Sequence, residues 1–199
     1  MGSNYEYKDK HFSSGVAEYY FDFQHGKELG LNKAGRQILQ FHLEKGGLSP
    51  KENEKLGEEE LLNRIIETAM KRLKRKGRAR QVVHPNKWYI SKEGTLIFGN
   101  GNECVYCFYN PRDRTEAETL GKKQWACNIG KTKRHFETRV SEQTRDWTQD
   151  PEIGLVLYTS DSQNLEGKIR KLLKTLDRHL PDFRAKGNDW YSTVLVLTL

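Results

Sequence analysis

The chain has 199 residues and a formal net charge of +7; 35% of its residues are hydrophobic and 11% are aromatic. This length suits one medium domain or two small ones, and the apolar content is enough for a buried core despite the high charge. No apolar run approaches the ~20 residues needed to cross a bilayer, and the polar opening MGSNYEYKDKHFSS is not a secretory signal, so we expect no membrane partner.

Residues 1–31 show no clear hydrophobic period and are predicted to form an N-terminal arm. Within the arm, AEYYFDFQ at residues 17–24 has two interpretations. It is either a short strand or an aromatic segment that packs on the body of the protein.

Three helices are predicted after this arm. The first begins at Asn32 and ends at Gly46, and the second covers SPKENEKLG at residues 49–57, which opens with a serine cap and a first-turn proline. The third is the strongest and covers residues 58–77, with acids at its start and bases at its end, as the helix dipole favours. Its apolar side chains recur at helical spacing: Leu61, Leu62, Ile65, Ile66, Ala69, Met70 and Leu73.

Most of the positive charge lies at the end of the third helix. Residues 71–80, KRLKRKGRAR, hold seven positive side chains and no negative ones, and without them the chain would be neutral. A local basic stripe suits a polyanion better than general solubility does, although a solvated helix end is the alternative interpretation. We therefore predict DNA contacts from the basic residues of this segment: Lys71, Arg72, Lys74, Arg75, Lys76, Arg78 and Arg80.

The segment RARQVVHPNKWYIS, which follows Gly77, is typical of two strands around a turn at residues 84–87. Three helices followed by a hairpin resemble a winged helix, in which the third helix enters the major groove and the hairpin contacts the DNA backbone. This resemblance predicts a winged-helix-like DNA-binding domain over residues 32–98. Small domains that bind other proteins share the pattern, and that alternative stays open.

A second domain is predicted over residues 99–199. Its elements, in order, are a strand at 103–110, a charged loop at 111–123, a strand at 124–130, a helix at 131–145, a buried strand at 153–160, a long helix at 161–180 and a last strand at 190–199. The long helix is expected to bury Leu165, Ile169, Leu172, Leu173, Leu176 and Leu180. The order predicts an α+β protein with a small mixed or antiparallel sheet flanked by helices.

The triplet Gly130-Lys131-Thr132 is not the end of a phosphate-binding loop. Such a loop needs a glycine five residues before the second glycine, where its backbone amides wrap the phosphates, and Trp125 stands there. The residues between are typical of a strand. An NTPase is therefore not favoured.

The same region resembles the GIY-YIG nuclease family instead. CVYCFY, with Val105 and Tyr106, stands where the family has Gly-Ile-Tyr, and CNIGKT, with Ile129 and Gly130, stands where it has Tyr-Ile-Gly. Val-Tyr and Ile-Gly-Lys-Thr are closest to the phage-type branch, which also has a late Gly-x-Glu-Trp-Phe similar to GNDWY at residues 187–191. The resemblance covers roughly residues 102–194 and depends on the order and spacing of the motifs.

This resemblance implies hydrolysis of a phosphodiester bond at four residues. Tyr106 would be the general base or its relay, with its pKa lowered by the charge of Lys131 and a metal, since an ordinary phenol is a poor base. Arg139, on the helix after Gly130, would hold the phosphate by its planar guanidinium. Glu166 would bind Mg²⁺ or Mn²⁺ with water as the remaining ligands.

Each of these residues also has an ordinary structural interpretation. Tyr106 fits a core tyrosine with a satisfied hydroxyl, Arg139 fits a surface helix position, and Glu166 fits a salt bridge with Arg170 at the rim of the apolar face. Two positions depart from the family pattern. Asn128 replaces the tyrosine of Tyr-Ile-Gly, and Cys104 replaces the glycine of Gly-Ile-Tyr.

The three cysteines argue against a disulfide framework and favour a reducing compartment, so we expect an intracellular protein, cytoplasmic or nuclear. Cys104 and Cys107 form a C-x-x-C pair in a predicted strand, where residues three apart point to opposite faces, which argues against a zinc site.

The sequence as a whole predicts a metal-dependent endonuclease on double-stranded DNA, held on its substrate by the basic segment. One active site cuts one strand, so a homodimer is compatible with double-strand cleavage. The alternative, favoured by Asn128, is a GIY-YIG fold that binds DNA or regulates without cleaving.

Overall fold

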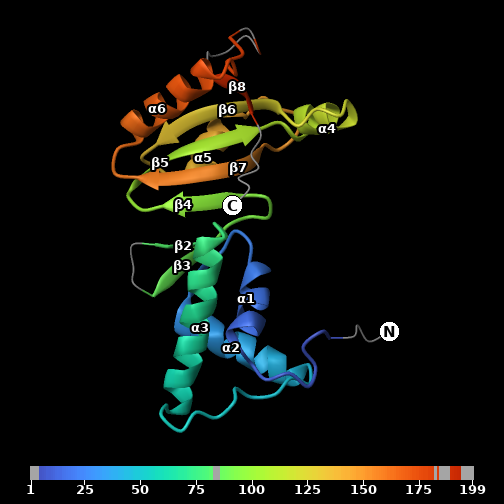
Figure 1. The fold of residues 1–199 in the computed structure, drawn as a ribbon, viewed down its shortest axis with the longest axis vertical. Helices are drawn as coiled ribbons and strands as arrows, with labels where there is room; N and C mark the ends of the chain where they lie inside the picture. The colour runs from blue at the N-terminus through green and yellow to red at the C-terminus, as the bar shows by residue number, and fades with distance from the viewer. Residues whose placement is uncertain (1–4, 83–85, 182, 184–188, 194–199) are drawn as a thin grey trace. The chain divides into compact units, whose positions relative to one another are not determined.

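The computed structural model describes residues 5–82, 86–181, 183 and 189–193, and divides into two compact units, Met1–Glu93 and Gly94–Leu199. Figure 1 shows the elements of each unit. In the described residues, six helices and two sheets confirm the predicted α+β class. None of the described helices is long and apolar enough to span a bilayer.

The first unit combines three helices with a small antiparallel sheet, whose strands lie in the order β1-β3-β2. Its helices pack around one apolar core that includes Phe21, Ile38, Met70 and Leu73. Its elements are α1 (Ser14–Asp22), β1 (Glu28–Gly30), α2 (Leu31–Glu44), α3 (Glu58–Arg75), β2 (Ala79–Gln81) and β3 (Lys87–Ile90).

Helix α1 corrects the prediction for the N-terminal arm. The aromatic segment at residues 17–24 is not a strand: most of it is helical, and Ala17 and Phe21 lie fully buried against the core, as the interpretation of a segment packed on the body expected. The Ser13 hydroxyl caps the helix by accepting from the backbone N–H of Val16, at 3.5 Å. Residues 1–31 thus include a helix of the first unit.

The second predicted helix, at residues 49–57, does not form. Four of its nine residues are charged and most are exposed, and Leu56 is its one large apolar side chain besides Pro50, so a helix here would have almost no apolar face to bury. Asn53 instead makes a local turn: its side-chain carbonyl accepts from the backbone N–H of Lys55 at 3.0 Å, and its backbone carbonyl accepts from Leu56 at 3.1 Å.

The predicted third helix is confirmed as α3. Its acidic first turn, its basic last turn and its buried face match the expectation. Gly77 ends it in a left-handed conformation with φ of 70°, and the N–H of Arg78 reaches back to the carbonyl of Leu73 at 2.8 Å. The hairpin strands follow as β2 and β3, while residues 83–85 of the predicted turn lie outside the described residues.

The second unit is built on a five-stranded mixed sheet in the order β4-β7-β5-β6-β8. The pairing of β4 with β7 is parallel and the other three pairings are antiparallel. Because β4 belongs to this sheet, the predicted domain boundary at residues 98 and 99 falls inside a strand of the second unit. The strands are β4 (Leu96–Gly99), β5 (Glu103–Tyr109), β6 (Trp125–Thr132), β7 (Glu152–Thr159) and β8 (Trp190–Thr193).

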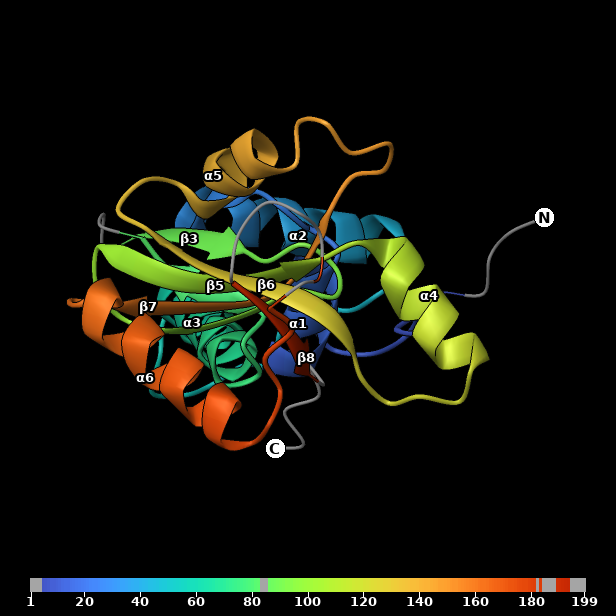
Figure 2. The ribbon, with the colours of Figure 1, turned by 90° about the horizontal axis from the view of Figure 1, so that it is seen from above.

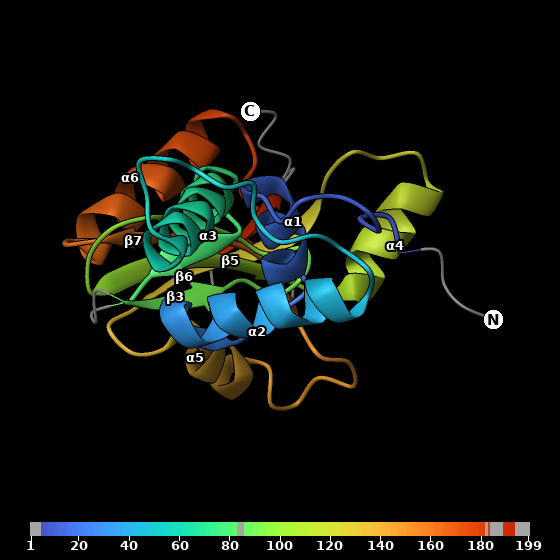
Figure 3. The same cartoon turned by 90° about the horizontal axis from the view of Figure 1, so that it is seen from below.

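Helices α5 (Phe136–Gln143) and α6 (Ser162–Thr175) cover opposite faces of this sheet, as Figures 2 and 3 show from two directions. Alternate residues of β5 therefore face different helices. Val105 packs in a cluster with Leu165 and Ile169 of α6, whereas the Tyr106 hydroxyl bonds to Gln143 of α5.

Two segments of the second unit differ from the prediction. The expected charged loop at 111–123 contains helix α4 (Pro111–Thr119), because Asn110 caps it and Pro111 occupies its first turn. The expected helix at 131–145 begins only at Phe136. Lys131 and Thr132 extend β6, where they pair with Val105 and Cys104.

Helix α6 is also shorter than predicted. It ends at Thr175, and Asp177 follows with φ of 53°. Leu172 and Leu176, which the pattern placed in the core, are 58% and 54% exposed. The last strand is described only over Trp190–Thr193, and residues 194–199 of the prediction lie outside the described residues.

Glu103 connects the start of β5 to the start of α6. Its carboxylate accepts from the Ser162 hydroxyl at 2.7 Å and the Ser162 backbone N–H at 3.1 Å, and pairs with Lys133 at 3.0 Å. These contacts lower the pKa of Glu103 from 4.5 to about 2, and the hydrogen bond from the Ser162 hydroxyl has the largest effect. Because the pKa of Glu103 is lower in the folded than in the unfolded protein, its charge stabilises the fold at pH values above the unfolded-state pKa. This stabilisation is lost as the pH falls through the folded-state pKa.

We therefore expect Glu103→Gln to lower the melting temperature at pH 7. The gap to the wild type should close as the pH falls from about 4.5 towards about 2, where the wild-type carboxylate is protonated too. Thermal melts across this range measure the gap, with Glu116→Gln on α4 as the exposed control. A gap that stays constant down to pH 2 would contradict the role of the charge.

Candidate functional site

The candidate site is organised around Tyr106 of β5 and Gly130 of β6, which face each other across the antiparallel ladder. A β-carbon at position 130 would lie 2.6 Å from the Tyr106 hydroxyl oxygen and 2.7 Å from its Cζ. The ring of Tyr106, which is 1% exposed, thus occupies the space that any side chain at position 130 would need. Glycine at this position is a steric requirement of the buried tyrosine.

The hydroxyl of Tyr106 donates a hydrogen bond to the side-chain carbonyl of Gln143 on α5, at 2.7 Å. Burial raises the pKa of this phenol to about 12, while the charge of Arg139 and a hydrogen bond with it act in the opposite direction. The charge of Glu166 is near enough to raise the pKa as well. The charges of Arg139 and Glu166 thus act on Tyr106 in opposite directions.

Arg139 extends from α5 and is held by a neighbouring acid. Its guanidinium contacts Glu142 at 3.1 Å, and Arg134 binds the same carboxylate through two bonds of 3.0 and 2.8 Å. Hydrogen bonds from Arg134 and then from Arg139 lower the pKa of Glu142. Two guanidinium groups thus share one carboxylate at the surface beside Tyr106, which leaves local positive charge for an anion.

Glu166 lies on the first half of α6 and is 6% exposed. One carboxylate oxygen pairs with the ammonium of Lys131 at 2.7 Å, and the other accepts from Arg170 at 3.0 Å. A buried carboxylate without partners is strongly unfavourable, so these two cations stabilise its charged form. Arg170 is thus the partner that the sequence suggested, but the pair lies at a buried position rather than at the rim.

Arg170 also connects Glu166 to the edge of β6. Its guanidinium donates to the backbone carbonyl of Ile129 at 3.1 Å and pairs with Asp189. Strand β8 pairs with β6 only as far as Asn128, so this carbonyl lies just beyond the end of the pairing. The Glu166 cluster is thereby fixed beside Gly130, on the α6 side of the strand.

The four predicted site residues therefore form two neighbouring groups on either side of β6. Tyr106 and Arg139 lie on the α5 face, and Glu166 and Lys131 lie on the α6 face, with Gly130 between them. Lys131 pairs with Glu166 and does not figure among the causes of the Tyr106 pKa shift. Arg139, not Lys131, is the side chain that lowers the pKa of Tyr106, and the opposite effect of burial is larger.

A carboxylate oxygen is a ligand that a hard cation accepts, but both oxygens of Glu166 are already bonded, one to Lys131 and one to Arg170. The described residues contain no group of three or more His, Cys, Asp or Glu side chains that could hold a metal, so a metal here would take one carboxylate and several waters. Mg²⁺ accepts such a set. The Lys131 ammonium, whose side chain is 34% exposed, already provides a positive charge at this carboxylate, and a cation could replace it.

The basic residues of the first unit differ in how they are used. Arg72 and Lys76 contact Glu18 of α1 at 3.8 and 2.5 Å. Arg78 is 16% exposed and bonds to Asp22 at 3.0 Å and to the carbonyl of Lys92 at 3.1 Å. These three side chains therefore connect α3 and its C-terminal turn to other parts of the unit.

The remaining bases of the segment are more open. Lys71 is exposed and reaches Glu67 only at 3.5 Å. Half-buried Lys74 and exposed Arg75 have no ion-pair partner within the residues that the structure describes, and Arg80 lies half-buried on β2. Lys71, Lys74 and Arg75 are thus the bases best placed to meet a polyanion.

Sequence reasoning missed two contributors to the site. Gln143, which accepts from Tyr106, follows Arg139 by four residues and so shares its helical face; this spacing was the available signal. No sequence signal pointed to Glu142, which bonds to Arg139, because an exposed acid on a short helix is common. Asn128, which departs from the family pattern, is 8% exposed and lies in β6 opposite Phe108. The three cysteines are buried free thiols.

Comparisons of the chain with protein-family models, with curated proteins and with solved structures find no match.

The contact between Tyr106 and Gly130 leads to a stability prediction. We expect Gly130→Ala to lower the free energy of unfolding by ~1–3 kcal/mol, because the new methyl group must displace a fully buried ring. The control is Gly167→Ala on α6, where a β-carbon meets nothing within 4 Å and alanine should stabilise the helix by up to ~1 kcal/mol. Urea titrations measure both. Equal stability of Gly130→Ala and the wild type would show that Tyr106 is not seated on this glycine.

Proposed function

We propose that the protein is a metal-dependent endonuclease that hydrolyses phosphodiester bonds in double-stranded DNA, with a GIY-YIG-like second unit. The observation that carries the proposal is the grouping of the candidate side chains around Gly130. The Tyr106 phenol bonds to α5 beside Arg139 on one face of β6, and the Glu166 carboxylate pairs with Lys131 on the other face. These are the groups that the resemblance assigns to the chemistry.

The state of Tyr106 narrows its role. With a pKa of about 12, roughly one molecule in a hundred thousand carries a phenolate at pH 7. The neutral hydroxyl donates to Gln143 and its oxygen accepts from Arg139, which leaves one lone pair to accept a hydrogen bond from a water molecule. In this proposal Tyr106 orients the attacking water as a hydrogen-bond acceptor, the proton of that water would leave to solvent, and Tyr106 is not a free phenolate base.

The other residues act on charge. Arg139 would bind the scissile phosphate by its guanidinium, which Glu142 holds in place. Glu166 would hold the Mg²⁺ or Mn²⁺ ion, whose chemistry when bound is to neutralise phosphate charge and acidify water. Lys131, released from one carboxylate oxygen, would remain beside the site as a second positive group.

The first unit would hold the DNA. Its three helices followed by the β2–β3 hairpin support the winged-helix-like proposal. The exposed side of α3 is nearly balanced in charge over most of its length, with Glu60 beside Arg64 and Glu67 beside Lys71 at 3.5 Å. The grip on phosphates is therefore assigned to the C-terminal end of α3, next to the hairpin.

A second candidate function is binding without cleavage. It is favoured by the Glu166 carboxylate, both of whose oxygens are taken by basic side chains, and by Asn128 in place of the family tyrosine. In that case the second unit would keep the fold as a DNA-binding or regulatory module. Cleavage and binding assays separate the two candidates.

The catalytic proposal predicts that the wild type converts supercoiled plasmid to nicked or linear DNA when Mg²⁺ is present. Arg139→Ala and Glu166→Gln should each slow cleavage by about a hundredfold or more, because charge stabilisation at the reacting phosphate is lost. Agarose gels over time give the rates. The matched controls, Arg145→Ala and Glu116→Gln, change exposed side chains of the same unit and should cleave as the wild type does.

Two results would contradict this prediction. Equal cleavage by all variants would mean that the residues are wrongly assigned or that another nuclease is present. A wild type that binds the plasmid but never cuts it would support the second candidate. Thermal melts of the Glu166→Gln variant check that the loss is not due to unfolding, since Lys131 and Arg170 both lose a charged partner.

The grip at the end of α3 predicts a change in salt dependence. The double change Lys74→Gln and Arg75→Gln should weaken binding to a DNA duplex and reduce the slope of log affinity against log salt by about 2, since each lost phosphate contact removes about 0.9. Fluorescence anisotropy without Mg²⁺ measures the slope. The control pair Lys51→Gln and Lys55→Gln removes the same charge from the exposed loop before α3, and an equal effect there would argue against a local grip.

A further inference from the structure

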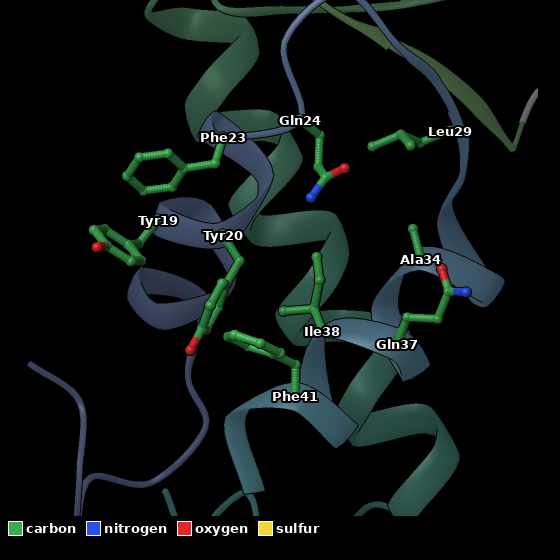
Figure 4. A pocket seen from close by; sticks show the side chains of 9 residues that line it. All are labelled: Tyr19, Tyr20, Phe23, Gln24, Leu29, Ala34, Gln37, Ile38 and Phe41. Carbon is green, nitrogen blue, oxygen red and sulfur yellow. The ribbon is translucent and has the colours of Figure 1, made fainter. Parts of the chain in front are cut away.

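The first unit contains an open groove of about 490 Å³ between α1 and α2, far along the chain from the residues of the candidate active site. Figure 4 shows its lining, with aromatic rings on one side and the amide of Gln24 pointing towards its middle. The groove is lined by Tyr19, Tyr20, Phe23, Gln24, Leu29, Ala34, Gln37, Ile38 and Phe41.

The aromatic rings of the groove are unusually accessible. Phe23 is 60% exposed, Phe41 is 44% exposed and Tyr19 is 37% exposed. Tyr19 meets Phe23 edge to face at 4.8 Å, and Tyr20 meets Phe41 in the same way at 5.3 Å. These pairs leave ring faces that a further flat group could cover.

One wall of the groove is held rigidly from behind. The hydroxyl of Tyr20 donates to that of Tyr5, which bonds to Nδ1 of His42 at 2.7 Å, and Nε2 of His42 bonds to the carbonyl of Lys10 at 2.9 Å. His42 is fully buried. Because the Tyr20 ring is already fixed by these hydrogen bonds, it loses little conformational entropy when a ligand binds, so this wall is preorganised.

Two ammonium groups contact the lining within the residues that the structure describes. The ammonium of Lys27 reaches the Gln24 side chain at 3.3 Å, and that of Lys45 lies 5.4 Å from the centre of the Phe41 ring. Both partners are uncharged, so neither ammonium is neutralised in these contacts. The acids of α1, Glu18 and Asp22, are instead paired with bases at the end of α3.

Aromatic faces, an amide and two ammonium groups together recognise one kind of ligand. A nucleotide offers a flat base that stacks, an edge that hydrogen-bonds to an amide and a phosphate that pairs with lysine. We infer that this groove binds unpaired bases of a single-stranded nucleic acid. A purely apolar partner, such as the face of an amphipathic helix, would use the rings but not the amide or the lysines. The inference concerns binding alone and does not depend on the proposed cleavage.

The test is fluorescence anisotropy of a labelled oligothymidine strand with EDTA present, so that cleavage cannot contribute. The variants are Phe23→Leu, Phe41→Leu and the two together, which keep apolar bulk but remove the π face. Each single change should weaken binding by about tenfold, and the pair by more. Because neither residue is charged, the salt dependence of binding should stay as in the wild type, unlike that of the α3 variants.

The controls are Leu120→Ala and Leu172→Ala, which alter exposed hydrophobic side chains of the second unit, 62% and 58% exposed in the wild type. They should bind the strand as the wild type does. Unchanged affinity in the double leucine variant would overturn the inference and leave an apolar partner as the better occupant. An equal loss in the controls would overturn it too. Thermal melts confirm that the variants are folded.

Discussion

The arrangement of the candidate site depends on one steric constraint, the contact between the Tyr106 ring and Gly130 on the neighbouring strand. The ring fills the volume of the missing side chain, and this position removes the phenol from water. Burial then raises the pKa of the phenol, so that the hydroxyl keeps its proton and donates it in a hydrogen bond to Gln143. The same missing side chain leaves little more than the backbone of β6 between the phenol on one face and Glu166 on the other.

Strand geometry connects this contact to the charges. Residues of a strand alternate between faces, so the register that places Gly130 under Tyr106 turns Lys131 to the other face, where it meets Glu166. Arg170, one helical turn beyond Glu166, completes the balance of charge. A buried carboxylate that is already matched by an ammonium needs little rearrangement to exchange that ammonium for a metal, and equally little to remain a purely structural pair. A cleavage assay, and not the geometry, therefore distinguishes a metal-binding Glu166 from a purely structural ion pair.

The elements that sequence patterns predicted well are those whose burial is periodic. The strands β5, β6 and β7 and the helix α3 carry continuous or regularly spaced apolar residues. Short elements set by caps were missed: α1 depends on Ser13, and α4 on Asn110 and Pro111. The roles proposed for Tyr106 and Glu166 come from motif order, whereas the side chains that contact them, Gln143, Lys131 and Arg170, are brought there by tertiary packing, which no local pattern contains.

The charge of the first unit also has two uses, and this limits what electrostatics can do for binding. Arg72, Lys76 and Arg78 hold α1 and its neighbours, so only part of the basic segment is available to phosphates. A small number of phosphate contacts gives weak affinity that salt reduces further. Stacking on exposed rings such as Phe23 and Phe41 is less sensitive to salt. If the first unit binds nucleic acid as proposed, the aromatic groove would therefore contribute a larger share of the affinity as the ionic strength rises.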